Sequence, residues 1–548
     1  MKRCWVLILL VSCGKDVTQP LESALLFTEV KTDIAPTVCG AEDPTQIIEV
    51  NGTGLALFDF DNDGDLDLFV VNAASLDDYS SGPGCRLYAN ISGENIVFQD
   101  VTEDMGIDIH AWANGVAVGD VNGDGYDDLY VTCHGPNVLI VNQEGRAFSN
   151  QTVEAGIGDD QWGTSARFGD LDGDGDLDLY VCNYVEFDAN NPPSRATYKG
   201  LSVLGGPHGM TPQHDLVYEN LGHGTFRDVT IQWGFTHEPA FALNVAILDV
   251  NGDGLQDVFV GNDSMSNHLY INTGESPTRF ENVGVRNGIA VNGDGSMQAT
   301  MGIAVADVNG NNRPDIFTTN FSSDTNTLQI NDDSGFFDDQ TKQYGLGLLS
   351  RSLLGWTCGF HDFDHDGDED LFIVNGHVYP EATRESIDSN REQPILLLER
   401  VGNRFVQCVQ TNVYRDRTAV FGDLDSDGDI DIVIAQRSGN VRVMRNDSSS
   451  RNTHGVHQSL TIALRGNGAN TKGLGATIHL TLDDGTVISR WNTDGFGFQS
   501  SISSAMTITI PEGKIPTQVE VVWPNGTRQI VTDPQEVGIQ VIVQPMSK

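Results

Sequence analysis

Short apolar segments alternate with acidic turns along most of this 548-residue sequence. The run Val116-Ala117-Val118 precedes one Asp-rich stretch, and Leu129-Tyr130-Val131 follows it. Runs of β-branched and aromatic residues bounded by Gly and Asp are typical of β-strands joined by tight turns. The pattern therefore predicts an all-β chain built from antiparallel hairpins.

One nonapeptide pattern, D-x-[DN]-x-[DN]-[GN]-x-x-D, occurs seven times. The copies span 59–67, 120–128, 170–178, 249–257, 307–315, 362–370 and 423–431, so their starts are 61, 50, 79, 58, 55 and 61 residues apart. Such quasi-regular spacing indicates one structural unit repeated seven times. We call the copies loops 1 to 7 and number the positions within each loop from 1 to 9.

Each unit contains signals for four short strands: one before the loop, one after it, and two more. Four antiparallel strands per repeat predict the blades of a β-propeller. A fourth strand led by Phe follows six loops, at Phe98, Phe148, Phe226, Phe280, Phe336 and Phe405. The seventh loop lacks one, and Phe27-Thr28-Glu29-Val30 could supply it. We therefore expect a seven-bladed propeller over 25–446, in which a strand near 25–31 completes the blade of residues 417–446 and removes an exposed sheet edge.

The composition of the loops predicts calcium binding. Ca²⁺ takes about six to eight oxygen ligands, whereas Mg²⁺ prefers a tighter octahedron with retained waters. A chain that wraps round the ion can present side chains from positions 1, 3 and 5, a backbone carbonyl from position 7 and a carboxylate from position 9. Four carboxylates in nine residues would repel one another without a cation. Ordinary Asp/Gly turns without an ion are the alternative.

The expected ligands share loop positions 1, 3, 5, 7 and 9. They are Asp59, Asp61, Asp63, Asp65, Asp67; Asp120, Asn122, Asp124, Tyr126, Asp128; Asp170, Asp172, Asp174, Asp176, Asp178; Asp249, Asn251, Asp253, Leu255, Asp257; Asp307, Asn309, Asn311, Arg313, Asp315; Asp362, Asp364, Asp366, Asp368, Asp370; and Asp423, Asp425, Asp427, Asp429, Asp431. We expect up to seven structural calcium ions. Loop 5 has only two carboxylates, so its occupancy is left open.

An EF-hand loop begins in a similar way but needs a Glu at position 12 and flanking helices. Position 12 of the seven loops is Val, Thr or Ile. The flanks are therefore expected to be strands, and each loop is expected to close a hairpin.

Several motifs carry a resemblance to known families. Phe168-Gly169-Asp170 and Phe421-Gly422-Asp423 resemble the FG-GAP/VCBS repeats of integrin α-subunit propellers. Gly206-Pro207-His208-Gly209 and the segment 375–380, with the C-terminal region, resemble bacterial relatives of cartilage acidic protein, which join such repeats to an ASPIC/UnbV domain. The resemblance implies a calcium-binding, extracellular and adhesion-like protein. It implies no defined reaction.

The Asp-rich loops stop after a linker at 447–455, and residues 456–545 alternate like short strands. Gly473-Leu474-Gly475-Ala476, Gly497-Phe498-Gln499-Ser500 and Trp523-Pro524-Asn525-Gly526 match the ASPIC/UnbV pattern. We expect a small β-sandwich that packs on the propeller, with Trp523 in its core or in a turn. A carbohydrate-binding module is the alternative.

Acidic residues outnumber basic ones by 77 to 31, which gives a formal charge of −46. This balance argues against nucleic acid as a partner, because phosphate would be repelled. Near the N-terminus, Leu10-Val11-Ser12-Cys13 resembles the lipobox of bacterial lipoproteins. The resemblance implies a signal peptide over 1–13, lipidation of Cys13 and a cell-envelope location at the outer membrane or cell surface, with the lipid as the only membrane contact. A plain N-terminal anchor is the alternative, but the apolar run is short of the ~20 residues of a spanning helix.

Six further cysteines follow Cys13, and an exported location permits disulfides. Among the possible pairings we favour Cys39 with Cys85. We expect a monomer.

Two blades carry long insertions, at 184–214 and 378–394, on the propeller face opposite the calcium hairpins. The connections between blades share that face and carry Trp112, Trp162, His237 and Trp356. We expect a protein or glycan ligand to bind there, because loops on a rigid scaffold commonly carry binding sites. Alternatively, these aromatic residues plug the mouth of the channel.

The sequence contains no G-x-S-x-G, H-E-x-x-H, P-loop or dinucleotide motif, which favours a binding or adhesion module over an enzyme. His208, His214, His237 and His377 fall on the insertion face and could meet there. They keep an exported polysaccharide lyase or hydrolase as the alternative. A purely structural role in an envelope complex is a third hypothesis.

Overall fold

The computed structural model describes residues 25–545 except 94, 236–238, 333, 409–411, 452–457, 504 and 536. The expected signal peptide with Cys13, and also His237, therefore lie outside the described residues. The described chain is all-β apart from two four-residue helices, α1 (Thr152–Ala155) and α2 (Arg384–Ile387), and three short 3₁₀ turns. No helix in this part of the chain is long and apolar enough to cross a membrane.

Seven sheets follow one another along residues 27–446, and each contains the four strands of one repeat. Their strands are β2 (Leu55–Phe58), β3 (Asp67–Val70), β4 (Arg86–Asn90), β5 (Phe98–Asp100); β6 (Trp112–Gly119), β7 (Asp128–His134), β8 (Val138–Asn142), β9 (Phe148–Asn150); β10 (Gly163–Gly169), β11 (Asp178–Asn183), β14 (Leu216–Asn220), β15 (Phe226–Asp228); β16 (Ala242–Leu248), β17 (Asp257–Asn262), β18 (His268–Asn272), β19 (Phe280–Asn282); β20 (Ile303–Ala306), β21 (Asp315–Thr318), β22 (Thr327–Asn331), β23 (Phe337–Asp339); β24 (Gly355–His361), β25 (Asp370–Asn375), β27 (Leu396–Val401), β28 (Arg404–Cys408); and β30 (Asp416–Gly422), β31 (Asp431–Gln436), β32 (Val441–Asn446), β1 (Phe27–Val30).

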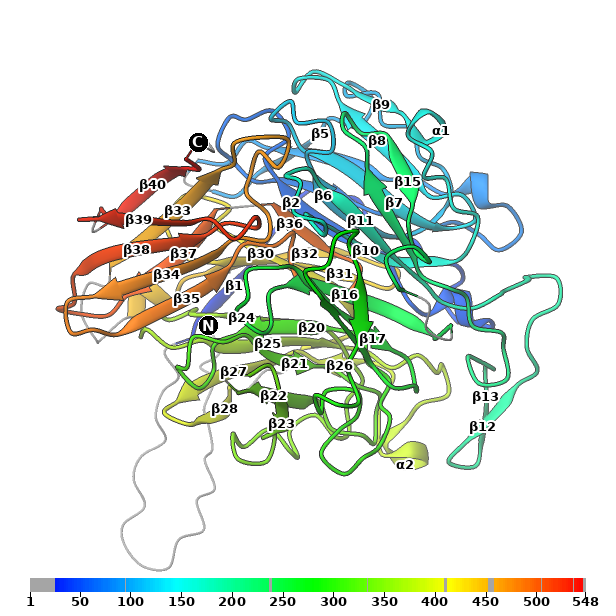
Figure 1. Ribbon diagram of the computed structural model, residues 1–548. Coiled ribbons are helices and arrows are strands. Elements are labelled where there is room, and N and C mark those ends of the chain that lie inside the picture. The colour runs from blue at the N-terminus through cyan, green and yellow to red at the C-terminus, as the bar shows by residue number, and fades with distance from the viewer. Residues whose placement is uncertain are drawn as a thin grey trace, which may run out of the picture.

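The first strands of the repeats form a closed ring at the centre of the molecule (Figure 1). Each of β2, β6, β10, β16, β20, β24 and β30 contacts the first strands of the sheets on either side, and β30 returns to β2. This closed arrangement of radial antiparallel sheets is that of a β-propeller. We therefore refer to the sheets as blades.

The last blade draws on both ends of the propeller sequence. β1 pairs antiparallel with β32, so that Phe27 lies opposite Asn446 and Val30 opposite Val443. Without β1, the outer edge of β32 would be an unpaired strand edge.

The fourth strand of each of the first six blades begins at or next to the expected phenylalanine. The prediction was wrong by one residue in the fifth blade, where β23 begins at Phe337. Phe336 is 46% exposed, whereas Phe337 is 7% exposed. The cause is a turn in which Asp332 and Phe336 bond to each other through their backbones, which leaves Phe337 to enter the core.

The C-terminal region forms two facing sheets round one apolar core. One sheet has the order β37 (Met506–Ile510), β33 (Gln458–Arg465), β40 (Gly538–Val543), and the other β35 (Val487–Trp491), β34 (Thr477–Leu482), β38 (Pro516–Val522), β39 (Arg528–Thr532). Trp523 is buried in this core, and its Nε1 donates to Gln529 Oε1 at 3.0 Å.

A segment of the C-terminal domain enters the centre of the propeller. β36 (Ser501–Ser503) pairs in parallel with β2 as a fifth strand of the first blade. Just before it, Phe498 is fully buried with its ring centroid 5.0 Å from that of Trp356. The carbonyl of Gly497 accepts a hydrogen bond from Arg167 Nη2 at 2.8 Å. The two domains are thus interlocked, and we call residues 493–503 the plug.

The two insertions lie on the side of the propeller away from the C-terminal domain (Figure 1). The first contains the hairpin β12 (Ala196–Tyr198) and β13 (Leu201–Val203); the second contains α2 and leads to β26 (Gln393–Pro394), which pairs with β29 (Val413–Tyr414). Arg195 forms an ion pair with Glu381, which joins the insertions. The three tryptophans expected near this face are all buried in the core of the propeller: Trp112, Trp162 and Trp356 are at most 2% exposed.

The expected disulfide between Cys39 and Cys85 is absent. Both cysteines are buried in separate apolar clusters.

Candidate metal sites

Each Asp-rich loop joins the first two strands of a blade, and position 9 is the first residue of the second strand in all seven. Six loops have Gly at position 6 in the left-handed region, for example Gly64 at φ 101° and Gly175 at φ 95°. Loop 5 has Asn312 there, at φ 63°. Only Gly adopts this conformation without strain, although Asn tolerates it better than most residues. The turn curls the loop back over its own position 1.

The position 1 carboxylate binds the backbone of its own loop. Asp59 Oδ1 accepts from Asp63 N and Asp59 Oδ2 from Gly64 N, both at 3.0 Å. The same bond from position 6 to position 1 occurs in loops 2, 4, 5, 6 and 7. These bonds fix the carboxylate inside the curl of the loop.

The position 9 carboxylate ties the loop to the third strand. In all seven loops one of its oxygens accepts from the backbone N–H of position 2, as Asp128 Oδ2 does from Val121 N at 2.9 Å. Its other oxygen accepts from the N–H at the end of the third strand, as Asp128 Oδ1 does from Asn142 N at 2.7 Å. These two bonds hold the carboxylate in a fixed position.

Positions 1, 3 and 9 converge in four loops. One oxygen from each lies within 4.8 Å of the others in loops 1, 3, 6 and 7: Asp59, Asp61, Asp67; Asp170, Asp172, Asp178; Asp362, Asp364, Asp370; Asp423, Asp425, Asp431. Loops 2, 4 and 5 have Asn at position 3. Such sets of hard carboxylate oxygens fit Ca²⁺.

The position 5 side chain plays a different part. One of its oxygens accepts from the backbone N–H of position 7, as Asp63 does from Asp65 N and Asp174 from Asp176 N. It braces the turn beside the converged carboxylates. The use of the position 7 backbone carbonyl as a ligand stays a prediction.

Burial raises the pKa of many loop carboxyls. The pKa of Asp67 rises to about 8, and that of Asp431 to about 8, chiefly through burial, with repulsion from other loop carboxylates adding to it. In loop 6, burial and the charges of Asp366 and Asp362 raise the pKa of Asp364 to about 7. The ionised loops are therefore unfavourable by themselves, and a divalent cation would offset both causes.

Loop 5 differs in its side chains as well as its charge. The Asn311 amide at position 5 donates to Asn331 O at 2.9 Å. The Arg313 guanidinium at position 7 packs against Gly252 of loop 4. Two carboxylates remain, Asp307 and Asp315, which is the smallest acidic set of the seven.

One residue at the end of each third strand, the last residue in six blades and the last but one in the sixth blade, is an element that sequence reasoning missed. Its side chain donates to the position 2 carbonyl of the loop in the preceding blade, as Asn142 Nδ2 does to Phe60 O at 2.8 Å. The full set is Asn90, Asn142, Asn220, Asn272, Asn331, Arg400 and Asn446. These bonds close a circle through all seven blades, and we call the set the bridging ring. The sequence signal was an Asn at the end of six third strands.

The expected histidines of the insertion face have different surroundings. His377 is buried beside Ser322, with 3.1 Å between Nε2 and Oγ, and burial lowers its pKa to about 3. His208 and His214 are exposed. A neutral, buried imidazole of this kind serves packing and hydrogen bonding.

Comparisons with known proteins identify both parts of the chain. The FG-GAP-like repeat family matches residues 59–131, 120–181 and 249–318, and the ASPIC and UnbV family matches residues 466–546. None of the curated proteins compared with the sequence matches it.

Solved structures with a similar arrangement are distant in sequence. One is BBS1N in complex with ARL6DN, with 9% identity, a TM-score of 0.42, and coverage of 77% of this chain and 97% of that chain. Another is the V. cholerae biofilm matrix protein Bap1, with 11% identity, a TM-score of 0.25, and coverage of 92% of this chain and 63% of that chain. Likeness at this level carries no conclusion about function. The family matches and the loop geometry together show that this chain is a protein of FG-GAP-like repeats, folded as a β-propeller, with a C-terminal ASPIC and UnbV domain.

Proposed function

We propose that this chain is an extracytoplasmic interaction or adhesion module whose propeller is stabilised by calcium. FG-GAP-like repeats joined to an ASPIC and UnbV domain support the interaction role. The observation that carries the calcium role is the convergence of carboxylates at positions 1, 3 and 9. The lipobox at Cys13 supports export and anchoring at the cell envelope.

Calcium would act on the scaffold. Position 9 of each loop bonds to the end of the third strand, and the bridging ring connects that strand to the preceding loop. An ion held by positions 1, 3 and 9 would therefore strengthen a contact between blades as well as a hairpin. Position 5 and the position 7 carbonyl would complete the oxygen shell.

Two measurements test this role: a calcium titration detected by calorimetry, and thermal unfolding in calcium and in chelator. We expect at least four ions to bind, and we expect excess chelator to lower the melting temperature. A matched pair of variants sharpens the test: Asp172→Asn changes a position 3 ligand, whereas Asp160→Asn changes an exposed acid outside the loops. Only the first should lower calcium affinity. Unchanged melting in chelator would refute the stabilising role.

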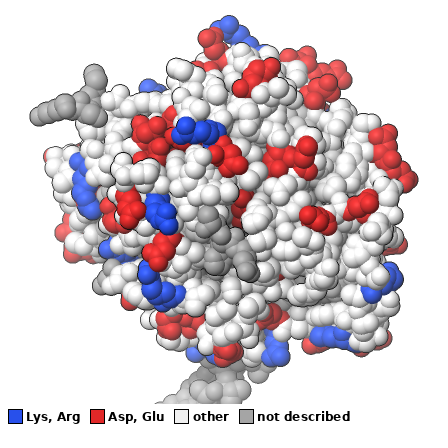
Figure 2. Space-filling model, turned by 45° about the vertical axis from the view of Figure 1, so that its right-hand side comes forward, with Lys and Arg blue, Asp and Glu red and all other residues white. Residues whose placement is uncertain are grey.

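A protein or glycan partner is proposed to bind on the insertion face. The two insertions support each other there, since Lys199 Nζ of the first donates to Ile387 O of the second at 2.8 Å. The two insertions contain six acidic and four basic residues, and acidic groups are spread over the side that Figure 2 turns forward, so a neutral or basic partner is favoured over an acidic glycan.

A glycan and protein array, probed in calcium and in chelator, tests this proposal. Arg195→Ala, which removes the ion pair between the insertions, should weaken binding, and Arg146→Ala, which removes an exposed ion pair on the second blade, should not. Equal binding by both variants would place the partner elsewhere.

A further inference from the structure

The C-terminal domain lies on the face of the propeller that carries the calcium loops. At loop 2, Thr471 Oγ1 donates to Asp120 Oδ2 at 2.6 Å, and Lys472 Nζ lies 2.7 Å from Asp127 Oδ2. Asp120 is an expected ligand at position 1, so the domain reaches the edge of the metal site itself. Asp127, at position 8, is 1% exposed.

The contacts continue round the propeller over loops 3 to 6. Asn470 N donates to Gly175 O of loop 3 at 2.8 Å. Loops 4, 5 and 6 contribute the pairs Gln256 Nε2 to Gly475 O at 2.9 Å, Ser489 Oγ to Asn312 Oδ1 at 2.9 Å, and Arg490 Nη1 with Glu369 Oε1 at 2.6 Å. One domain is therefore in contact with five successive loops.

Position 8 supplies much of this interface. Its side chain is Asp127 in loop 2, Gln256 in loop 4 and Glu369 in loop 6, and each bonds to the domain. In loop 3 it is Leu177, which packs in one apolar cluster with Leu474 of the domain. Position 8 directly precedes the position 9 ligand. The domain thus contacts residues whose placement depends on how the loop folds.

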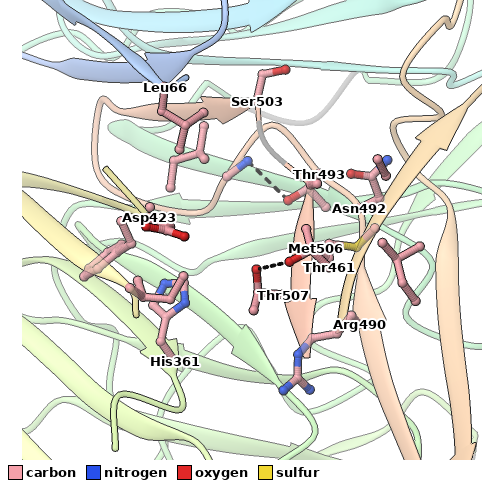
Figure 3. Close-up of a pocket in the computed structure, with 18 of the residues that line it drawn as sticks. Leu66, His361, Asp423, Thr461, Arg490, Asn492, Thr493, Ser503, Met506 and Thr507 are labelled. Carbon is pink, nitrogen blue, oxygen red and sulfur yellow. Dashed lines mark hydrogen bonds between the residues drawn. The ribbon is translucent and has the colours of Figure 1, made fainter. Parts of the chain in front are cut away.

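The contact between the two domains is less continuous over loops 7 and 1, although Gly428 of loop 7 still lies close to the side chain of Ser459 in β33. A cleft of about 1510 Å³ opens there, lined by Asp423 of loop 7 and Asp59 of loop 1 on one side. Thr461 of β33 and Thr507 of β37 face it from the C-terminal domain (Figure 3). Asp61, at position 3 of loop 1, is exposed. Loop 1 therefore carries the same metal-site chemistry as loop 3, while a cleft separates it from the domain.

Charge shows why this docking needs a counter-ion. The loops carry 24 Asp at positions 1, 3, 5 and 9, whereas residues 458–543 contain five basic and seven acidic residues. The domain is thus acidic overall and cannot neutralise the loops. Its two basic contacts, Lys472 and Arg490, are already paired with position 8 acids.

We propose that docking of the C-terminal domain on the propeller requires calcium in the loops it contacts. This inference rests on the proposed calcium role. Bound ions would neutralise the acidic face and fix the turn that presents Gly175 O and Asn312 to the domain. Lys472 has the opposite effect, because carboxylates without bound calcium would attract its ammonium group more strongly and so favour docking. This attraction involves one lysine, whereas repulsion between the acidic domain and the acidic loops involves the whole face. We therefore expect calcium to favour docking overall.

The test uses the full chain with a protease site placed within residues 452–457. The protein is folded in calcium, cleaved between the domains, and analysed by size-exclusion chromatography in calcium and in chelator. We expect the fragments to elute together in calcium and to dissociate in chelator, with at least a tenfold rise in the dissociation constant. Circular dichroism reports whether the propeller stays folded.

If chelation unfolds the propeller, two matched variants test whether docking itself depends on calcium. Asp172→Asn weakens loop 3, which contacts the domain, and Asp61→Asn makes the same change in loop 1, at the cleft. At limiting calcium, Asp172→Asn should raise the dissociation constant of the fragments several-fold more than Asp61→Asn. Equal effects, or fragments that stay together after their calcium has been removed, would overturn the inference. A chain that binds no calcium at the start would instead refute the proposed function.

Discussion

The bridging ring makes a prediction that no single blade would suggest. Asn142 is fully buried, at the end of the third strand of the second blade. Its Nδ2 donates to Phe60 O at 2.8 Å, across the boundary between blades, and to Asp127 O at 3.2 Å. Its Oδ1 accepts from Gly145 N at 2.8 Å. Asn142→Ala removes all three bonds and leaves their partners buried.

The expected loss follows from these bonds. A buried polar group that loses its hydrogen-bond partner costs about 1–3 kcal/mol, and a carbonyl that can still use its second lone pair costs about the lower value. The groups left without a partner are the carbonyls of Phe60 and Asp127 and the N–H of Gly145. Because the structure around them can relax in part, we expect the free energy of unfolding to fall by about 2–4 kcal/mol in total. Because the proposed calcium ligands are the carboxylates and not this amide, the loss should persist in saturating calcium.

Urea unfolding in excess calcium measures the effect as a change in midpoint at constant slope. Asn150→Ala is the matched control, because Asn150 lies in the neighbouring strand of the same blade and is exposed, and its side chain accepts hydrogen bonds from Thr152 in the adjoining turn. The control should cost less than about 1 kcal/mol. If both variants lose equal stability, the ring does not hold the blades together.

Three further predictions follow from the loops and the plug. In chelator, the free energy of unfolding should fall as pH rises from about 4 to about 8, because Asp67 and Asp431 have folded pKa values of about 8 and the folded state then holds more protons than the unfolded state. In calcium the trend should reverse, since ligands must be deprotonated; thermal melts with the same slope in both buffers would contradict this. Phe498→Ala should cost about 3–5 kcal/mol in urea unfolding, whereas Phe336→Ala, at an exposed side chain, should cost less than about 1 kcal/mol. Asp170→Asn should remove one calorimetric calcium site, while Asp307→Asn in loop 5 should leave the number of tight sites unchanged; equal losses would show that loop 5 binds as tightly as loop 3.

Local chemistry explains which features the sequence could reveal. The loops were visible because a metal site needs oxygens at fixed spacing, and the left-handed turn needs Gly at position 6. The pairing of β1 could be inferred because the seventh repeat lacks a fourth strand, and the N-terminal strand belongs to no other repeat. Phe336 was misplaced because two adjacent phenylalanines fit the pattern equally, and the Asp332 turn decides between them.

Long-range packing explains what the sequence could not reveal. Phe498 lies in a stretch that resembles its family, yet nothing in its neighbours shows that it enters the propeller to meet Trp356. The contacts of Lys472 and Arg490 with the loops join residues far apart in the chain. The ligand face was predicted to lie opposite the loops, but nothing in the sequence shows that the C-terminal domain lies on the loop face.

The position of the plug has a consequence for the order in which the molecule is assembled. Residues 493–503 are synthesised after every blade, yet they occupy the centre of the fold. A nascent chain that has completed the seven blades still lacks the plug, and the side of Trp356 that packs on Phe498 stays uncovered until the last domain is made. The packing round the plug is therefore the last to form, and a stop during late synthesis would leave this part of the core open to water.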